Sequence, residues 1–189
     1  MAEALSLAGV DASAEAVIIS GGGLTREAAL AFVALEKAGQ KKISLFMDDD
    51  DTWEQSGFKL ISGKNDGGKA GASKSPTGSA TNYPVSSRNG IIITHQEGER
   101  GIFPRIVIAC GENVPEKIQD EKVVHMPYKD LLNSDGAPKM AREIWNVLSK
   151  AGVPRYAELV CYSDDPGEAA VVYFTLRLMG FPDVRILVN

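Results

Sequence analysis

The fold class is decided by residues 158–188, which read ELVCYSDDPGEAAVVYFTLRLMGFPDVRILV. The apolar run Glu158–Tyr162 predicts a buried strand, and a short loop from Ser163 to Gly167 follows it. Apolar residues at helical spacing then predict a helix from about Glu168 to Met179, and Val184–Val188 predicts a second strand. Strand, helix and strand in this order form a βαβ unit, whose two strands are expected to lie parallel in one sheet.

The same kind of unit occurs near the N-terminus. Ala16–Ile19 predicts a strand, and the glycine-rich loop Ser20–Thr25 follows it. A helix is predicted from about Arg26 to Lys37, where Gly39 ends it, and Ile43–Met47 predicts the second strand.

The two units align along their length, which indicates an internal repeat. The tripeptide at 8–10 recurs 143 residues later, and the helix-ending Gly39 recurs 141 residues later. The change of offset makes the first strand-to-helix loop two residues longer than the second. Under this alignment Ser20 occupies the position of Ser163.

A segment poor in apolar residues, 62–88, divides the chain. Its content of Gly, Ser, Lys and Thr predicts a flexible linker. Residues 1–61 then form a partial βαβ segment, and residues 89–189 form a domain with candidate strands beginning at Gly90, Arg105, Lys122, Glu158 and Val184, and a further helix at Lys139–Lys150. We therefore predict an α/β fold in which a mainly parallel five-stranded sheet carries helices on both faces, preceded by the second half of a related βαβ domain.

The N-terminal pair of strands is expected to need a partner. A two-stranded parallel unit leaves a sheet edge and an apolar face uncovered. We therefore expect this chain to be part of a longer polypeptide or of an oligomer.

Composition and charge narrow the class of protein. The 189 residues are 44% hydrophobic and 24% charged, as in a soluble globular protein. A net charge of −5 without a basic stripe argues against nucleic acid, and no apolar run is long enough for membrane insertion. Without a signal sequence the cytoplasm is the default compartment, and the periplasm stays open if the N-terminus is missing. Cys110 and Cys161 lack metal-ligand spacing, and neither a metal nor a cofactor is expected.

Several segments together carry a family resemblance. Residues 123–139 read VVHMPYKDLLNSDGAPK, residues 143–153 read EIWNVLSKAGV, residues 159–163 read LVCYS, and residues 176–185 read LRLMGFPDVR. In order and spacing they resemble the rhodanese (sulfurtransferase) superfamily, specifically its tandem-domain members. In the N-terminal part, the loop SGGGL and the later stretch DTWEQSGF are similar to the non-catalytic first domain of such proteins.

The resemblance implies a nucleophilic cysteine at the position that Ser163 holds. Sulfur transfer through a persulfide needs a thiolate in a cradle of backbone N–H groups at a helix N-terminus. A serine hydroxyl cannot form a persulfide, and its activation needs a general base. The carboxylates of Asp164, Asp165 and Glu168 would also repel thiosulfate, a dianion. Together with Gly167, these residues form a candidate ligand-binding loop.

The two cysteines are alternative sulfur carriers. Cys161 lies two residues before Ser163, and strand alternation points both toward one face of the sheet. Cys110 follows the strand at 105–109, near the carboxyl ends of the strands. Packing as small apolar side chains is the simpler interpretation for both.

The first loop is a second candidate binding site. Ser20 precedes Gly21, Gly22 and Gly23, which allow close approach of a ligand, and Arg26 adds a positive charge at a helix start. A phosphate- or dinucleotide-binding interpretation stays open, but neither a complete G-x-G-x-x-G nor a P-loop motif is present. Turn geometry inherited from a degenerate domain is the simpler interpretation.

Two further features have structural interpretations. The consecutive carboxylates Asp48–Asp51 cannot all converge on one metal ion, and they predict a solvated turn. Trp53 and Trp145 are expected to be core anchors.

Three hypotheses for function follow. The first is a catalytically degenerate rhodanese-like protein that binds a protein partner or small ligand at the Ser163 loop. The second is a sulfurtransferase that carries sulfur on Cys110 or Cys161, so enzymatic activity stays open. The third is a piece of a longer polypeptide or complex.

Overall fold

The computed structural model describes residues 5, 10–57, 59, 83–84, 88, 90–94, 102–115, 118 and 122–188. The linker predicted at 62–88 lies outside this part of the chain, apart from Tyr83, Pro84 and Arg88. The elements in chain order are β1 (Ala16–Ile19), α2 (Arg26–Ala38), β2 (Ile43–Phe46), α3 (Asp50–Gln55), β3 (Ile92–Ile93), β4 (Arg105–Ala109), β5 (Val123–His125), the 3-10 helix η2 (Tyr128–Leu131), α4 (Ala141–Lys150), β6 (Glu158–Tyr162), α5 (Pro166–Leu178) and β7 (Val184–Leu187).

The larger sheet has five parallel strands in the order β3-β7-β6-β4-β5. β6 lies at its centre, and all five residues of this strand are buried. A strand covered on both faces needs apolar residues at successive positions, which explains the unbroken run Leu-Val-Cys-Tyr. The predicted α/β fold with a parallel five-stranded sheet is confirmed.

The two faces of this sheet have different covers. Helices α4 and α5 pack on the face that carries Ile108, Leu159 and Cys161. The chain steps in one direction along the sheet from β5 to β6 and from β6 to β7, so right-handed crossovers place both helices on one side. The connection from β4 to β5 steps the other way, and its described residue Ile118 packs with Val160 on the opposite face.

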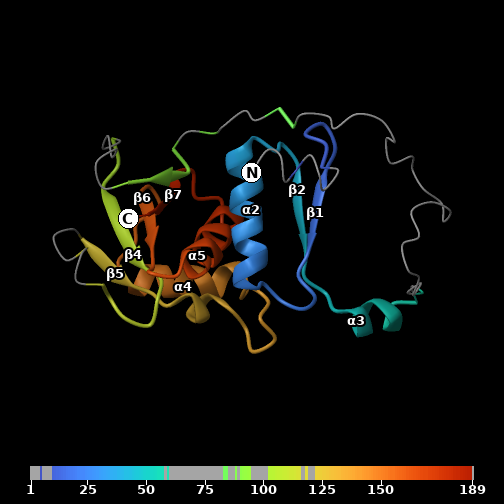
Figure 1. Ribbon diagram of the computed structural model, residues 1–189. Coiled ribbons are helices and arrows are strands. Elements are labelled where there is room, and N and C mark those ends of the chain that lie inside the picture. Colours follow the sequence, from blue (N-terminus) through green and yellow to red (C-terminus); the bar gives the residue numbers. More distant parts are fainter. Residues whose placement is uncertain are drawn as a thin grey trace.

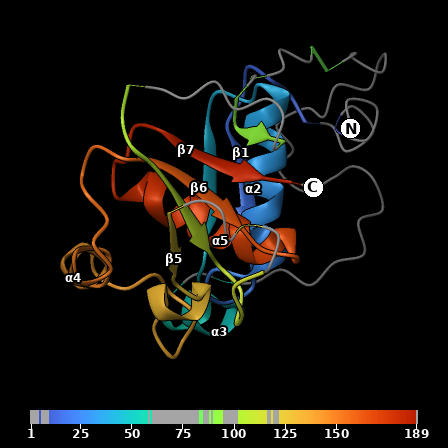
Figure 2. The same ribbon diagram turned by 90° about the vertical axis from the view of Figure 1, so that its left-hand side faces the viewer.

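The N-terminal unit forms a second, two-stranded parallel sheet. β1 pairs with β2, and α2 packs between this small sheet and α5 (Figure 1). After a turn of 90° about the vertical axis, the strands of the larger sheet lie in front, with α5 and then α2 behind them (Figure 2). Two helices therefore lie back to back between two sheets.

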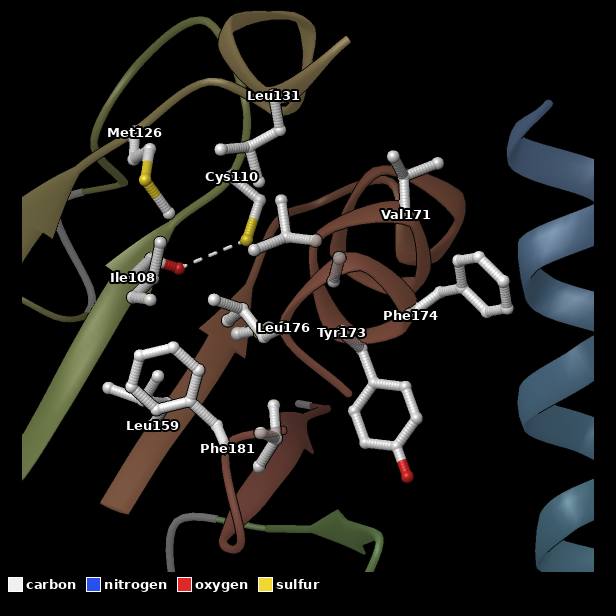
Figure 3. Packing of buried hydrophobic residues seen from close by; sticks show 14 of the residues in the cluster. Ile108, Cys110, Met126, Leu131, Leu159, Val171, Tyr173, Phe174, Leu176 and Phe181 are labelled. Carbon is white, nitrogen blue, oxygen red and sulfur yellow. Dashed lines mark hydrogen bonds between the residues drawn. The ribbon is translucent and has the colours of Figure 1, made fainter. Parts of the chain in front are cut away.

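Helix α5 is buried on nearly all sides because it has a sheet on one side and α2 on the other. Leu176 points toward the strands, whereas Phe174 extends toward α2 (Figure 3). Phe174 meets Phe32 of α2 edge to face, with ring centroids 4.9 Å apart. Aromatic pairs favour this arrangement, and it fixes how the two helices meet.

A buried carboxylate also links the two helices. Glu36 of α2 accepts a hydrogen bond from the Tyr173 hydroxyl of α5 at 2.8 Å. The same carboxylate pairs with Arg88 at 3.1 Å and with Arg177 at 3.4 Å. Burial, and then the bond to Glu36, raise the pKa of Tyr173. A buried charge is tolerated here because several donors surround it.

The two βαβ units have the same strand register. β1 and β2 pair Ala16 with Ile43, and β6 and β7 pair Leu159 with Val184. The sequence offsets of 143 and 141 relate these same residues: Ala16 to Leu159, and Ile43 to Val184. The alignment made on sequence therefore agrees with the hydrogen-bond ladder of both units.

The remaining sequence features lie at the margin of the fold. Trp53 meets Phe46 edge to face at 5.2 Å, and Arg155 lies 4.5 Å from the ring of Trp145. Both tryptophans are half-buried, so they line the edge of the packed regions rather than their interior. In the acidic run, Asp49 caps α3 by accepting from the backbone N–H of Thr52 at 2.7 Å. None of the described helices is long and apolar enough to cross a membrane.

Candidate functional site

Ser163 lies where β6 ends and the loop to α5 begins. Asp165 caps α5, because its Oδ1 accepts from the backbone N–H of Gly167 at 2.8 Å. Pro166 takes the first helical position, where its missing N–H leaves nothing unsatisfied. The helix therefore begins two residues earlier than the predicted Glu168, and Ser163 lies just before its N-terminus.

Two hydrogen bonds hold the Ser163 hydroxyl. Ser163 Oγ donates to Oε2 of Glu168 at 2.6 Å, and it accepts from the backbone N–H of Asp165 at 3.2 Å. Gly111, which follows the neighbouring strand β4, lies against this pair: a Cβ at Gly111 would be 3.0 Å from Glu168 Oε2 and 3.1 Å from Ser163 Oγ. The Glu168 carboxylate and the Gly111 backbone therefore crowd the hydroxyl.

The other carboxylates of this loop also have partners. Asp165 Oδ2 forms an ion pair with Arg26 NH1 at 2.6 Å, which joins the two predicted binding loops. Asp164 Oδ1 accepts from the Tyr162 hydroxyl at 3.1 Å. Burial, and then the bond to Asp164, raise the pKa of Tyr162.

The first loop uses its polar groups internally. Ser20 Oγ donates to the carbonyl oxygens of Gly23 at 2.6 Å and Phe46 at 3.1 Å. The N–H of Gly23 donates to the Met47 carbonyl at 2.7 Å, and Thr25 Oγ1 caps α2. Gly21 and Gly22 complete this turn, with φ of 72° and 123°. In this conformation two of the donors that a phosphate group would need already have partners.

Gly23 brings the first loop against the C-terminal part of the chain. Its φ is +67°, and a Cβ there would be 2.8 Å from the carbonyl oxygen of Asp135 and 2.9 Å from Gly136. The next residue, Leu24, donates its N–H to the Gly136 carbonyl at 2.8 Å. The glycine is required by close approach of two backbones, which supports the turn-geometry interpretation of this loop.

The comparisons with known proteins give structural relatives. No protein-family model and no curated protein matches the sequence. SseA of Escherichia coli, a 3-mercaptopyruvate sulfotransferase with the rhodanese fold, matches 99% of this chain with a TM-score of 0.70 at 18% identity. Tum1 of Saccharomyces cerevisiae matches 98% with a TM-score of 0.67 at 16% identity. The anaerobic ergothioneine biosynthesis enzyme of Chlorobium limicola matches 98% with a TM-score of 0.65 at 15% identity.

The chain has a rhodanese-like fold. It spans 72% of SseA, 67% of Tum1 and 50% of the Chlorobium enzyme, so each of these chains is longer. At identities below 20% the likeness establishes the fold, and function has to be argued from the site.

The two cysteines lie inside the core of this rhodanese-like fold. Cys110 and Cys161 are both fully buried and come from the ends of adjacent strands, β4 and β6. Cys110 Sγ donates to the carbonyl oxygen of Ile108 at 3.2 Å (Figure 3). Burial, and then the contact with the Cys110 thiol, raise the pKa of Cys161. A buried thiol with a raised pKa has little thiolate character and little access to a sulfur donor.

An ion pair and a histidine lie near the Ser163 loop. Lys129 forms an ion pair with Glu112 at 2.9 Å, and this contact lowers the pKa of Glu112 and raises that of Lys129. His125 Nε2 lies 3.0 Å from the carbonyl oxygen of Gly111 rather than at Ser163. The second histidine, His95, lies outside the described residues.

The sequence did not predict three contacts of this candidate site. It placed Glu168 in the loop as a repelling carboxylate, but not as the acceptor for Ser163. It gave no role to Gly111, although a glycine two residues after a buried strand can indicate close approach of another group. The pairing of Arg26 with Asp165 joins residues 139 positions apart, and no local pattern predicts it.

Proposed function

We propose that this chain is a rhodanese-like protein without the family's cysteine nucleophile, and that its Ser163 loop binds a partner or small ligand instead of transferring sulfur. Ser163 follows the central strand and precedes a helix N-terminus, which is the placement that sulfur transfer requires of a nucleophile. Because this position carries a hydroxyl and not a thiol, we infer that the protein keeps the fold but cannot form a persulfide there.

The observation that carries this proposal is the 2.6 Å hydrogen bond from Ser163 to Glu168. The carboxylate places negative charge where a thiosulfate dianion would have to approach. At a few ångströms each such contact costs about 1–4 kcal/mol. A carboxylate is also a weak base for a hydroxyl, and the described His125 contacts Gly111 instead.

The balance of charge in the loop favours a cationic group on the ligand. Arg26 pairs with Asp165, and Lys129 pairs with Glu112, although the charge of Lys129 also acts on Glu168. Asp164 and Glu168 accept hydrogen bonds from neutral hydroxyls, so their negative charges are not cancelled by those partners. We infer that the loop recognises a guanidinium or amine, on a small molecule or on a basic segment of a protein.

The competing hypothesis for function is a sulfurtransferase that carries sulfur on Cys110 or Cys161. The adjacency of the two thiols favours it, whereas their burial and the raised pKa of Cys161 oppose it. If sulfur transfer resides in this chain, Cys110→Ala or Cys161→Ala abolishes it. A binding protein is indifferent to both changes as long as it stays folded.

We also infer that the chain is a tandem of related units: a partial unit at 1–61, a linker at 62–88 and a domain at 89–189. The matching registers of β1–β2 and β6–β7 support the repeat. The shared core, in which Ala29 and Val33 cluster with Leu159 and Leu176, means that the two parts pack as one body.

Amide NMR of the isotopically labelled full chain tests the proposed binding. We expect acetyl-arginine amide to shift the amides of Asp164, Asp165 and Gly167 saturably, and thiosulfate to leave them unchanged. Glu168→Gln should weaken the arginine response about fivefold, because one charge-assisted contact is lost. The matched control is Glu27→Gln, the equivalent exposed position at the start of α2, which should bind normally. Saturable shifts with thiosulfate alone would contradict the proposal.

A further inference from the structure

A cavity with a volume of about 430 Å³ lies between α4 and the chain that joins α5 to β7. Its size is that of a site for a small molecule. Trp145, Met179 and Phe181 supply much of its apolar lining, and each of the three is at least partly buried. Among the described residues, the charged side chains that line it are two arginines, Arg142 and Arg155. Figure 2 shows α4 at the side of the molecule, away from α2 and from the small sheet.

The cavity and the Ser163 loop lie at opposite ends of α5. Ser163 comes before the first residue of this helix, whereas Met179 and Gly180 follow its last residue. The helix has 13 residues, which corresponds to a length of about 20 Å. A ligand in the cavity is therefore separate from whatever the Ser163 loop binds.

Two helix ends shape this cavity. Gly180, with a φ of +81°, ends α5, and Phe181 then donates its N–H back to the Leu176 carbonyl at 3.2 Å. Gly152 ends α4 with the same kind of turn, at a φ of +74°. Each turn folds the chain back along its helix, and the two returning segments bring Phe181 and Arg155 to the lining.

The two arginines keep their donors free of acidic partners within the described part of the chain. Arg142 precedes Trp145 by three positions and lies on the same face of α4. The guanidinium of Arg155 lies over the Trp145 ring, 4.5 Å from its centroid. This stacking uses the flat face of the guanidinium, whereas its N–H groups point outward in the plane. Neither arginine forms an ion pair with a described residue.

The acidic side chains nearest to the lining in sequence are directed elsewhere. Glu143 follows Arg142, but its carboxylate turns back to accept from the backbone N–H of Met140 at 3.2 Å. Asp183, two residues after Phe181, pairs with the next strand's arginine at 2.9 Å. Neither carboxylate lines the cavity, so the charge that faces it is positive.

We propose that this cavity binds a small molecule that joins an aromatic ring to an anionic group. The ring packs against Trp145, Met179 and Phe181, which removes apolar surface from water. The anionic group, a carboxylate or a phosphate, accepts charge-assisted hydrogen bonds from Arg142 and Arg155, whose planar donors match its oxygen atoms.

NMR of the isotopically labelled full chain tests this proposal through the indole N–H groups. The chain has two tryptophans, so Trp145 reports on the cavity and Trp53, in α3, serves as an internal reference. The probe is naphthalene-2-carboxylate. We expect it to shift the Trp145 signal saturably and to leave the Trp53 signal unchanged.

Charge variants and a neutral probe test the role of the arginines. Arg142→Gln and Arg155→Gln should each weaken binding about tenfold, because one charge-assisted contact is lost. Naphthalene-2-carboxamide, which keeps the ring without the charge, should bind at least about tenfold more weakly. The matched control is Lys150→Gln, at an exposed position of α4 outside the cavity lining, which should bind normally. Far-UV circular dichroism checks that each variant is folded.

A titration with 2-naphthyl phosphate distinguishes the two anionic groups. Tighter binding than that of the carboxylate assigns the site to an aryl phosphate, and weaker binding assigns it to an aryl carboxylate. The proposal is overturned if no probe shifts the Trp145 signal saturably, or if the carboxamide binds as tightly as the carboxylate. Weakening by Lys150→Gln as large as that by the arginine variants also overturns it, since the charge of the cavity lining would then not matter.

Discussion

At the scale of single residues, the chemistry of the candidate site depends on which atom stands at position 163. In the proposed function, Ser163 takes the place of the family's nucleophile with an oxygen atom, and the structure shows that its hydroxyl donates to Glu168. A thiol in this place would benefit from the N-terminus of α5, which stabilises a thiolate, but Glu168 would oppose ionisation. The site therefore needs two changes, rather than one, to become reactive.

A double variant with Ser163→Cys and Glu168→Gln should become able to accept sulfur from thiosulfate. We expect the new thiolate to attack the outer sulfur of thiosulfate and release sulfite, which leaves a persulfide that intact mass detects as a reductant-sensitive gain of one sulfur atom. Ser163→Cys alone should react at least about tenfold more slowly, because the carboxylate raises the pKa of the new thiol. Equal rates for the two variants would mean that Glu168 has no electrostatic influence on this position.

Tyr173 makes stability depend on pH in the alkaline range. Its folded-state pKa is raised above the ordinary value of 10.0, first by burial and then by Glu36. The stabilisation is therefore complete below about pH 10 and declines as the pH rises beyond it, since the unfolded chain loses the proton more easily. Tyr173→Phe should cost about 1.5 kcal/mol at neutral pH and flatten this decline in urea unfolding. An unchanged slope in the variant would contradict the assignment.

At the scale of elements, the first loop is shaped by backbone contact with Asp135 and Gly136. Gly23→Ala should destabilise the fold by about 2–4 kcal/mol, because it adds a clash with the Asp135 carbonyl to the strain of a positive φ. Gly21 has a φ of +72°, and an added Cβ there would meet open space. Gly21→Ala should therefore lower the free energy of unfolding by only about 1–2 kcal/mol. Equal costs in denaturant unfolding would show that the Asp135–Gly136 approach is not tight.

The pattern of apolar residues predicted most helices and strands, because burial of an element determines which of its positions are apolar. β4 and β6 were predicted at their observed bounds, since strands buried on both faces leave continuous apolar runs. α5 was predicted to start at Glu168 because the capping of the helix by Asp165 is a side-chain geometry that periodicity does not encode. Contacts such as Glu36 to Tyr173 join residues 137 positions apart, and only the packing of α2 on α5 brings them together.

At the scale of the whole molecule, the two units share one core, so they should unfold together. Trp53 lies in the N-terminal unit and Trp145 in the C-terminal one, which makes each a reporter of its own half. In Trp145→Phe and in Trp53→Phe, the fluorescence of the remaining tryptophan should follow the same thermal transition as far-UV circular dichroism. An earlier transition at Trp53 would mean that the small sheet opens independently of the larger one.

We propose that this chain does not transfer sulfur, and intact mass tests that proposal most directly. The unmodified full chain is incubated with thiosulfate and with 3-mercaptopyruvate, and it is weighed with and without reductant. We predict no gain in mass with either donor, because Ser163 cannot form a persulfide and both cysteines are buried. A reductant-sensitive gain of one sulfur atom, mapped to Cys110 or Cys161, would contradict the account and make the chain a sulfurtransferase with a relocated nucleophile.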